Sequence, residues 1–256
     1  MNFFRDGITR VVGHRGSPTK ALENTFESFD RAEADGADGV ELDVRLTLDG
    51  EAVVFHDPEI VIGDRRMPVA QVTMPELAAV EVVRAEFRGR VPTLREVLER
   101  YGSAGRFLVE LKTGPSPRPG LLEFRVAALL AQMHVLDRAV VLSFSADMLR
   151  RVKEHEPRVE TCLNFDATAF RPTGRFWPDL PKGCETIGPN VALATGRLMA
   201  EAKEAGVGVH VWTVNDAEVA RQLAVWGAAS VISDDVTLVG PAIRSATGAT
   251  PPLTLV

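Results

Sequence analysis

The chain has 256 residues, 45% of them hydrophobic, which is enough to bury one large core. Its net charge of -6 and pI near 5.5 give no basic surface for nucleic acid or an acidic membrane, so an anionic substrate needs a local basic site. No stretch approaches the roughly 18 apolar residues of a membrane helix, and the two cysteines lack metal or redox spacing. We therefore expect a cytoplasmic protein with reduced thiols and no stable membrane insertion.

A short β-branched strand over residues 9–12 opens the predicted fold and ends in the loop Gly13-His14-Arg15-Gly16. The two glycines of this loop permit either close approach of a ligand or an ordinary tight turn. A helix follows, with Asn24 as its expected cap, Glu27 three residues further on and Gly36 as its stop.

Residues 39–58 predict two strands joined by a tight turn, and they carry most of the candidate chemistry. Strand alternation places Glu41 and Asp43 on one face and leucine and valine side chains on the other. If Asp49-Gly50 forms a two-residue loop, Asp43 lies directly opposite His56. We expect this register because a slip of one residue would bury His56 among the leucines.

Residues 57–90 have weak periodicity and predict an irregular surface excursion with one helical piece over 75–83. The next helix begins with a capping box formed by Thr93 and Glu96. Strands and helices then alternate. The expected strands are 106–112, 139–144, 159–165, 186–189, 207–214 and 231–234, and the expected helices are 93–101, 121–133, 146–154, 195–205 and 216–226.

This β/α order favours a closed TIM-type (β/α)8 barrel over an open doubly wound sheet. We expect a single domain over residues 1–256, with the irregular connection of residues 57–90 between its second and third strands. The segment 245–256 is rich in Thr and Pro, so we expect a tail outside the core.

Three carboxylates, Glu41, Asp43 and Glu110, interrupt apolar strand segments. They could form surface salt bridges, but an unpaired carboxylate is costly to desolvate and a cation resolves that cost. All-oxygen ligands favour Mg²⁺ or Ca²⁺, whereas His14 and His56 leave zinc open as a lesser alternative.

His14 and His56 each follow a strand, and two imidazoles across a substrate can act as general base and general acid near neutral pH. A structural role is the alternative for any single histidine. We assign His134 and His155 to helix ends and His210 to a hydrogen-bonded position in the core.

Arg15 and Lys112 are cations at the same predicted barrel mouth. With three carboxylates and a divalent ion they leave a formal charge of about +1, which a phosphodiester monoanion would balance. A carboxylate or a sulfate ester would satisfy the same arithmetic.

Seven motifs follow one another along the chain: His14-Arg15-Gly16, Glu23-Asn24-Thr25, Glu41-Leu42-Asp43-Val44, Val53-Val54-Phe55-His56-Asp57, Glu110-Leu111-Lys112, Ser143-Phe144 and Val211-Trp212-Thr213-Val214-Asn215. Together they resemble the glycerophosphodiester phosphodiesterase family over nearly the whole chain, and such an ordered set is more specific than any single motif. The sequence departs from the family pattern at Leu22, where proline is usual, at Ala228-Ala229-Ser230 and at Ser233-Asp234-Asp235.

The resemblance implies a TIM-type barrel that cleaves glycerophosphodiesters, such as glycerophosphocholine, to glycerol 3-phosphate and an alcohol. The residue roles that it implies are a divalent metal held by Glu41, Asp43 and Glu110, catalysis by His14 and His56, phosphate binding by Arg15 and Lys112, and substrate contacts by Glu23, Phe144 and Trp212.

Two other functions stay open. A lysophospholipase-D-like activity could use Phe170, Phe176 and Trp177 as an apolar mouth for an acyl chain, although these side chains also suit loop packing. A phosphate-ester binding protein without catalysis is the second alternative, and the presence of both His14 and His56 argues against it.

Overall fold

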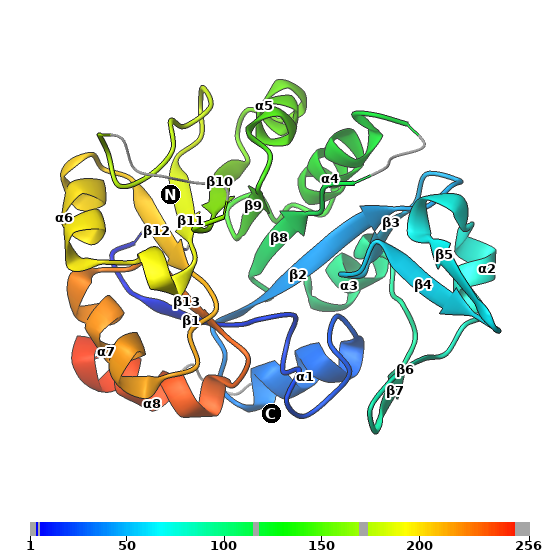
Figure 1. Ribbon diagram of the computed structural model, residues 1–256, viewed down its shortest axis with the longest axis horizontal. Coiled ribbons are helices and arrows are strands. Elements are labelled where there is room, and N and C mark those ends of the chain that lie inside the picture. Colours follow the sequence, from blue (N-terminus) through cyan, green and yellow to red (C-terminus); the bar gives the residue numbers. More distant parts are fainter. Residues whose placement is uncertain (1–3, 5, 115–117, 169–173, 249–256) are drawn as a thin grey trace.

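The fold is a closed parallel barrel, as the alternation of elements predicts (Figure 1). The computed structural model describes residues 4, 6–114, 118–168 and 174–248. In this part of the chain eight parallel strands pair side by side, and pairing of the first with the second closes the barrel. The strands are β1 (Arg10–Gly13), β2 (Gly39–Leu46), β8 (Phe107–Leu111), β9 (Ala139–Ser143), β10 (Glu160–Phe165), β11 (Thr186–Pro189), β12 (Gly208–Val211) and β13 (Ser230–Ser233).

Helices surround the barrel in Figure 1. They are α1 (Phe26–Ala34), α3 (Leu94–Tyr101), α4 (Leu121–Gln132), α5 (Ala146–His155), α6 (Gly196–Glu204), α7 (Ala217–Trp226) and α8 (Val236–Thr247), with short 3₁₀ turns η2 (Val69–Gln71) and η3 (Val191–Leu193). Between β10 and β11 the described residues form no helix. The predicted capping box is present, because Thr93 accepts from the Glu96 backbone and Glu96 bonds back to Thr93.

Two helix predictions are wrong. The cap of α1 is Thr25, whose side chain accepts from Ser28 N, whereas Asn24 is buried with φ 59°. The expected tail begins too early, because α8 extends to Thr247 and Ala246 packs against the core. Gly240 and Pro241 disfavour a helix interior, which is why the sequence did not predict α8. Residues 249–256 lie outside the described residues.

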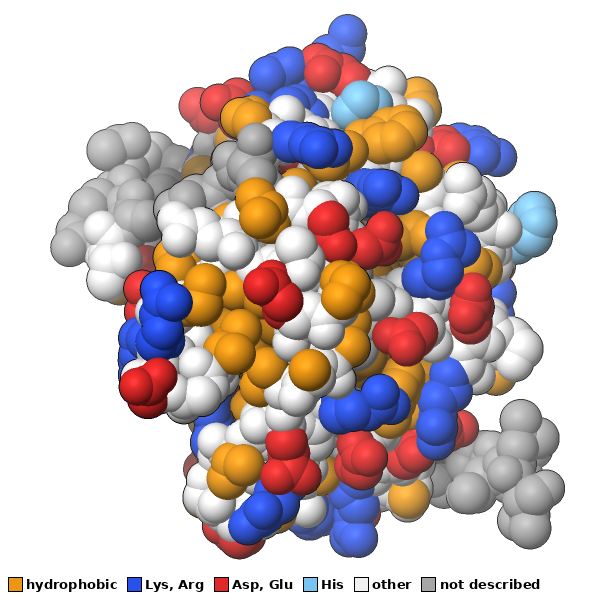
Figure 2. Space-filling model, turned by 90° about the vertical axis from the view of Figure 1, so that its right-hand side faces the viewer, with side chains coloured by type: hydrophobic (Ala, Val, Ile, Leu, Met, Phe, Trp, Pro, Cys, Tyr) orange, Lys and Arg blue, Asp and Glu red, His pale blue; other side chains and the backbone are white. Residues whose placement is uncertain are grey.

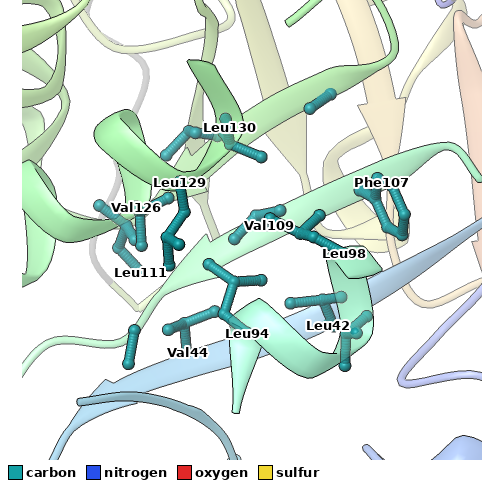
Figure 3. Packing of buried hydrophobic residues seen from close by; sticks show 14 of the residues in the cluster. Leu42, Val44, Leu94, Leu98, Phe107, Val109, Leu111, Val126, Leu129 and Leu130 are labelled. Atoms are coloured by element: carbon teal, nitrogen blue, oxygen red, sulfur yellow. The ribbon is translucent and has the colours of Figure 1, made fainter. Parts of the chain in front are cut away.

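The outer face of β2 is apolar and packs against the helix layer, as strand alternation predicts. Leu42 and Val44 lie beside Leu94 and Leu98 of α3, and Val109 of β8 belongs to the same buried cluster (Figure 3). The opposite faces of the strands meet inside the barrel. There a smaller apolar cluster that includes Val12, Leu108, Leu142 and Ile232 fills the interior. The polar side chains of the candidate site continue the inward face of these strands towards their carboxyl ends.

The hairpin between β2 and β3 (Ala52–Val54) is antiparallel as predicted, but its predicted register is wrong by one residue. Val44 pairs with Val54 and Leu46 with Ala52, so Asp43 is opposite Phe55. The Phe55 N–H donates to the backbone oxygen of Asp43 at 2.9 Å. Since these pairs leave residues 47–51 as the loop, Asp49-Gly50 is not a two-residue turn.

The register failed because both faces of β3 are buried. Val54 joins the main core, while Val53 packs with Ile60, Val69 and Leu77 of the following segment. The alternation of apolar and polar side chains therefore could not show which face of β3 points towards the main core. His56 lies beyond the last residue of β3, so its direction is not set by the strand.

Residues 57–90 lie between the second and third barrel strands as expected, but they are not irregular. They form the hairpins β4 (Glu59–Ile62) with β5 (Arg65–Pro68) and β6 (Val82–Arg84) with β7 (Phe87–Gly89), and the helix α2 (Met74–Ala78). The predicted helical piece over 75–83 is thus shorter and begins earlier. These strands have three or four residues and many arginines, so their periodicity is too short to detect. Figure 2 shows the face that carries this insertion, with hydrophobic side chains among acidic and basic ones.

Candidate active site

The predicted site residues come from different strands but meet towards the carboxyl end of the barrel. His14 directly follows β1, and Glu110 is the fourth of the five residues of β8. Phe144 and Trp212 directly follow β9 and β12. In a parallel barrel these ends share one face, where the active sites of TIM-barrel enzymes lie.

Three carboxylates form the centre of the site. Asp43 of β2 pairs in register with Glu110 of β8, and one ligand oxygen of each, together with one of Glu41, lies within 4.8 Å of the others. The side chains of Glu41 and Asp43 are 4% and 1% exposed, and that of Glu110 is 12% exposed. The structure therefore brings together the three acidic residues selected from the sequence.

These carboxyl groups differ in their affinity for protons. Burial, reinforced by the charge of Asp43, raises the pKa of Glu41 to about 8. Burial also raises the pKa of Glu110, although Lys112 opposes this effect. Burial acts in the same direction on Asp43, but Lys112 and Arg15 outweigh it and lower the pKa of that group.

Asp43 lies between the two predicted cations. Arg15 Nε is 3.1 Å from Asp43 Oδ2, and Lys112 Nζ is 3.1 Å from Oδ1 of the same carboxylate. Lys112 Nζ also donates to Glu110 Oε1 at 2.6 Å. Asn24 Nδ2 donates to Asp43 Oδ2 at 2.8 Å, which explains the burial of an amide that the sequence suggested as a helix cap. The cations are thus held beside the carboxylates, where an anionic group could bind.

His14 is held by the end of the last barrel strand. Its Nδ1 lies 2.6 Å from Asp234 Oδ1, and its Nε2 lies 4.0 Å from Glu41 Oε2. Burial acts to lower the pKa of His14, but the hydrogen bond to Asp234 and the charge of Glu41 outweigh it, so the pKa is raised. Asn215 Nδ2 donates to the other oxygen of Asp234 at 2.6 Å.

His56 is held in a similar way by its neighbour in sequence. Its Nδ1 lies 2.8 Å from Asp57 Oδ1. Burial lowers the pKa of His56, although Asp43 and Asp57 act in the opposite direction. Since an ionised carboxylate only accepts, the Nδ1 atoms of both histidines carry protons and their Nε2 atoms are left to exchange protons.

Glu23 contacts basic side chains of the site. Its Oε1 accepts from Arg15 Nη1 at 3.1 Å and lies 2.7 Å from Nη1 of Arg84, which comes from the β6–β7 hairpin. Glu23 therefore orients Arg15.

The two aromatic candidates lie together. The rings of Phe144 and Trp212 pack edge to face with centroids 5.5 Å apart, and Trp212 Nε1 donates to the Gly188 oxygen at 2.7 Å. Phe144 is 39% exposed, so this pair presents an apolar surface beside the barrel mouth.

Sequence reasoning placed four polar residues of the site outside it. Asn24, which bonds Asp43, was assigned to a helix cap. Asp234, Asn164 and Arg84, which bond His14, Glu110 and Asp57, were given no role. Asp234 and Asn164 carry a usable signal, because each lies at the end of a barrel strand. Arg84 carried none, because its hairpin was not predicted.

Other sequence predictions are settled away from the site. His210 is fully buried with Nδ1 2.8 Å from Ser230 Oγ, as expected. Trp177 is buried and Phe176 packs against the same core cluster, so these two rings are not an apolar mouth. Phe170 lies outside the described residues. Cys162 and Cys184 are free thiols, as expected.

The acidic cluster fits a divalent ion. It offers oxygen donors from three neighbouring side chains, which suits a hard cation better than zinc. The raised pKa of Glu41 also indicates room for a cation. The cations around this carboxylate neutralise it incompletely, and a bound ion would replace its proton. Glu41, Asp43 and Glu110 would hold this ion.

Comparison with known proteins agrees with the barrel and the site. The model of the glycerophosphoryl diester phosphodiesterase family matches residues 14–238. A glycerophosphodiester phosphodiesterase of Caldanaerobacter subterraneus is 32% identical over 237 residues, covering 89% of this chain and 94% of the relative. The crystal structure of a Silicibacter pomeroyi protein has a TM-score of 0.83 at 26% identity, covering 97% of this chain and 98% of its own.

An Oleispira antarctica phosphodiesterase, solved in complex with the product sn-glycerol-3-phosphate, has a TM-score of 0.73 at 24% identity and covers 94% of this chain and 98% of its own. At this identity it supports the fold alone.

A barrel of this topology with these matches defines a phosphoric diester hydrolase. More specifically, the chain belongs to the glycerophosphoryl diester phosphodiesterase family, as the sequence motifs implied. Among the described residues, no helix is both long enough and apolar enough to cross a bilayer.

Proposed function

We propose that this chain hydrolyses glycerophosphodiesters to glycerol 3-phosphate and an alcohol by metal-dependent catalysis with two histidines. The observation that carries the proposal is that His14 and His56 are each held at Nδ1 by an aspartate, beside one cluster of three carboxylates and two cations. The Oleispira antarctica phosphodiesterase of the same fold was solved with sn-glycerol-3-phosphate as its product, and the product proposed for this chain is the same compound.

His14 and His56 exchange the protons of the reaction. The pKa of His14 is raised and that of His56 is lowered, so the two imidazoles differ in their affinity for protons, as suits a general acid and a general base. One takes the proton of the nucleophile and the other gives a proton to the leaving alkoxide. Arg15 and Lys112 bind the phosphate oxygens, and Phe144 with Trp212 lines the organic part of the substrate.

Mg²⁺ or Ca²⁺ bound by Glu41, Asp43 and Glu110 would supply a Lewis acid for the phosphoryl oxygens. The nucleophile is either the neighbouring glycerol hydroxyl, which would give a cyclic phosphate, or water. Trapping a cyclic phosphate with slow variants would identify the first route.

The test is a substrate panel that includes glycerophosphocholine, assayed with Mg²⁺, Ca²⁺ or chelator and scored for glycerol 3-phosphate. We expect metal-dependent release by the wild-type protein and its loss in His14→Ala and in His56→Ala, with thermal unfolding unchanged. His155→Ala, an exposed position at the end of α5, is the matched control and should retain activity. Binding of phosphate esters without turnover would instead indicate a non-catalytic binding protein.

A lysophospholipase-D-like activity is the second candidate, favoured by a cleft of about 810 Å³ between the two insertion hairpins. The cleft is lined by Phe55, Ile60 and Val83 as well as by Asp57, the partner of His56. Comparing lysophosphatidylcholine with glycerophosphocholine distinguishes the two activities. If an acyl chain binds in the cleft, the exposed substitution Val83→Ser lowers turnover of the lysophospholipid alone.

The proposed setting is the cytoplasm. The free thiols of Cys162 and Cys184 support it, because reducing compartments maintain unpaired cysteines.

A further inference from the structure

In the β6–β7 hairpin, Arg84 pairs with two carboxylates of the site, Glu23 and Asp57, whereas Arg88 pairs with Glu81. Its Nη2 donates to Asp57 Oδ2 at 2.8 Å, and its Nη1 lies 2.7 Å from Glu23 Oε1. One guanidinium thus joins two carboxylates that come from opposite ends of a stretch of more than thirty residues.

Each of these carboxylates holds a residue of the proposed mechanism. Asp57 binds His56 Nδ1 through its other oxygen, at 2.8 Å. Glu23 Oε1 also accepts from Arg15, whose Nε lies 3.1 Å from Asp43. Arg84 therefore links the histidine that follows β3 with the arginine that follows β1.

We propose that Arg84 is a positioning residue that sets the placement of His56, through Asp57, relative to that of Arg15, through Glu23. The planar guanidinium can bond two carboxylates at once in a fixed geometry, which an ammonium group cannot reproduce. If it is removed, Asp57 and Glu23 lose the cation that they share and repel one another. The imidazole and the phosphate-binding guanidinium then separate. This inference rests on the proposed function, because it assigns Arg84 a role in that reaction.

The effect on stability should be small. The side chain of Arg84 is 49% exposed, and exposed ion pairs contribute little to the free energy of unfolding. The effect on turnover should be larger, because displacing an aligned catalytic group by about 1 Å can cost about a hundredfold in rate.

The hairpin offers a matched control. Arg88 lies on the neighbouring strand β7, is 67% exposed and pairs with Glu81 at 3.4 Å. Arg88→Ala removes the same charge from the same hairpin without touching Asp57 or Glu23.

Arg84→Ala, Arg84→Lys and Arg88→Ala are compared by steady-state kinetics on glycerophosphocholine and by thermal unfolding. We expect kcat/KM of Arg84→Ala to fall about 10- to 100-fold, with partial recovery in Arg84→Lys and a change below about twofold in Arg88→Ala. Asp57→Asn should mainly lower kcat and Glu23→Gln should mainly raise KM, whereas Arg84→Ala should do both. In the Asp57→Asn/Glu23→Gln background, Arg84→Ala should have no further effect.

A second readout needs no substrate. The ¹⁵N resonances of the His56 imidazole should shift in Arg84→Ala and stay unchanged in Arg88→Ala. Equal kinetics and equal His56 resonances for these two variants would overturn the role of Arg84. A wild-type protein without phosphodiesterase activity would instead overturn the proposed function, and a shift of the His56 resonances alone would then show Arg84 positioning an imidazole that serves a different reaction.

Discussion

The imidazole of His14 and the carboxylate of Asp234 are joined at 2.6 Å between Nδ1 and Oδ1, and so link the first barrel strand to the last. β1 and β13 pair in parallel, with Gly13 opposite Ser233 at their ends. His14 and Asp234 are the residues that directly follow these two ends. Closure of the barrel therefore also orients the histidine.

Asp234→Asn should lower both the pKa of His14 and the turnover number. The substitution removes the carboxylate whose hydrogen bond, together with the charge of Glu41, outweighs burial at His14, and an amide can donate to Nδ1 and reverse the tautomer. We expect a loss of kcat on the order of a hundredfold and a downward shift of the His14 titration followed by NMR. Asp235→Asn is the control, because it keeps a capping side chain on α8 and because the Asp235 carboxylate contacts Thr237 and Lys20. Equal titrations of His14 in both variants would contradict the assignment.

Glu41 should make the stability of the metal-free protein depend on pH. Its pKa is about 8 in the fold against a reference value of 4.5, so between these values the folded chain binds a proton that the unfolded chain has released. The free energy of unfolding contributed by this group therefore falls as pH rises through that window. Thermal unfolding in chelator from pH 5 to pH 8 measures it. Glu41→Gln should flatten the dependence, while Glu33→Gln, an exposed change on α1, should leave it intact.

Metal binding below pH 8 should release a proton from Glu41, since the ion and the proton compete for one carboxylate. Calorimetric titration with Mg²⁺ or Ca²⁺ in buffers of different ionisation enthalpy counts the protons released. The count should fall in Glu41→Gln, and a wild-type count of zero would contradict the raised pKa of Glu41.

Asn164→Leu should weaken metal binding without removing a ligand. Asn164 Nδ2 donates to Glu110 Oε2 at 3.2 Å and so orients that carboxylate. Loss of such an outer partner typically costs about 10- to 100-fold in metal affinity. Another asparagine near the end of a barrel strand, Asn190, is not a suitable control, because Asn190→Leu would remove the cap of η3. The exposed Gln132→Leu at the end of α4 serves as control and should bind the ion as the wild-type protein does.

Leu94→Ala should destabilise the barrel by about 2–5 kcal/mol through the lost burial and the cavity left behind. Leu94 is 0% exposed and belongs to the cluster between α3 and the outer face of β2 (Figure 3). The matched change Leu238→Ala, at a side chain 46% exposed on α8, should cost less than about 1 kcal/mol. Denaturant unfolding gives both values, and similar losses would contradict the packing.

The barrel was predictable from sequence because apolar strand segments alternate with helices that are long enough to show their period, and because capping residues such as Thr93 mark helix starts. The register between β2 and β3 was not predictable. Val53 and Val54 are both fully buried, so the side chains of β3 show no alternation of buried and exposed positions. The helix α8 was missed because Gly240 and Pro241 interrupt its propensity, which tertiary packing of Val239 and Ile243 overrides.

The charged centre of the site was predictable for a different reason. Glu41, Asp43 and Glu110 are carboxylates in apolar strands, so their cost of burial is visible in the sequence. The residues that orient them carry no such cost. Asn24 looked like a helix cap, and only the path of the chain shows that its amide bonds Asp43. Partners of this kind depend on contacts between distant segments, which local pattern does not encode.

The antiparallel pairing of β3 with β2 places the residues of the site in two parts of the fold. The carboxylates belong to the barrel, whereas His56 stands at the entrance to the insertion, whose small cluster includes Val53, Ile60 and Leu77. Small units open more readily than a closed barrel. Gentle warming should therefore abolish activity by freeing the imidazole of His56 while Glu41, Asp43 and Glu110 stay in place.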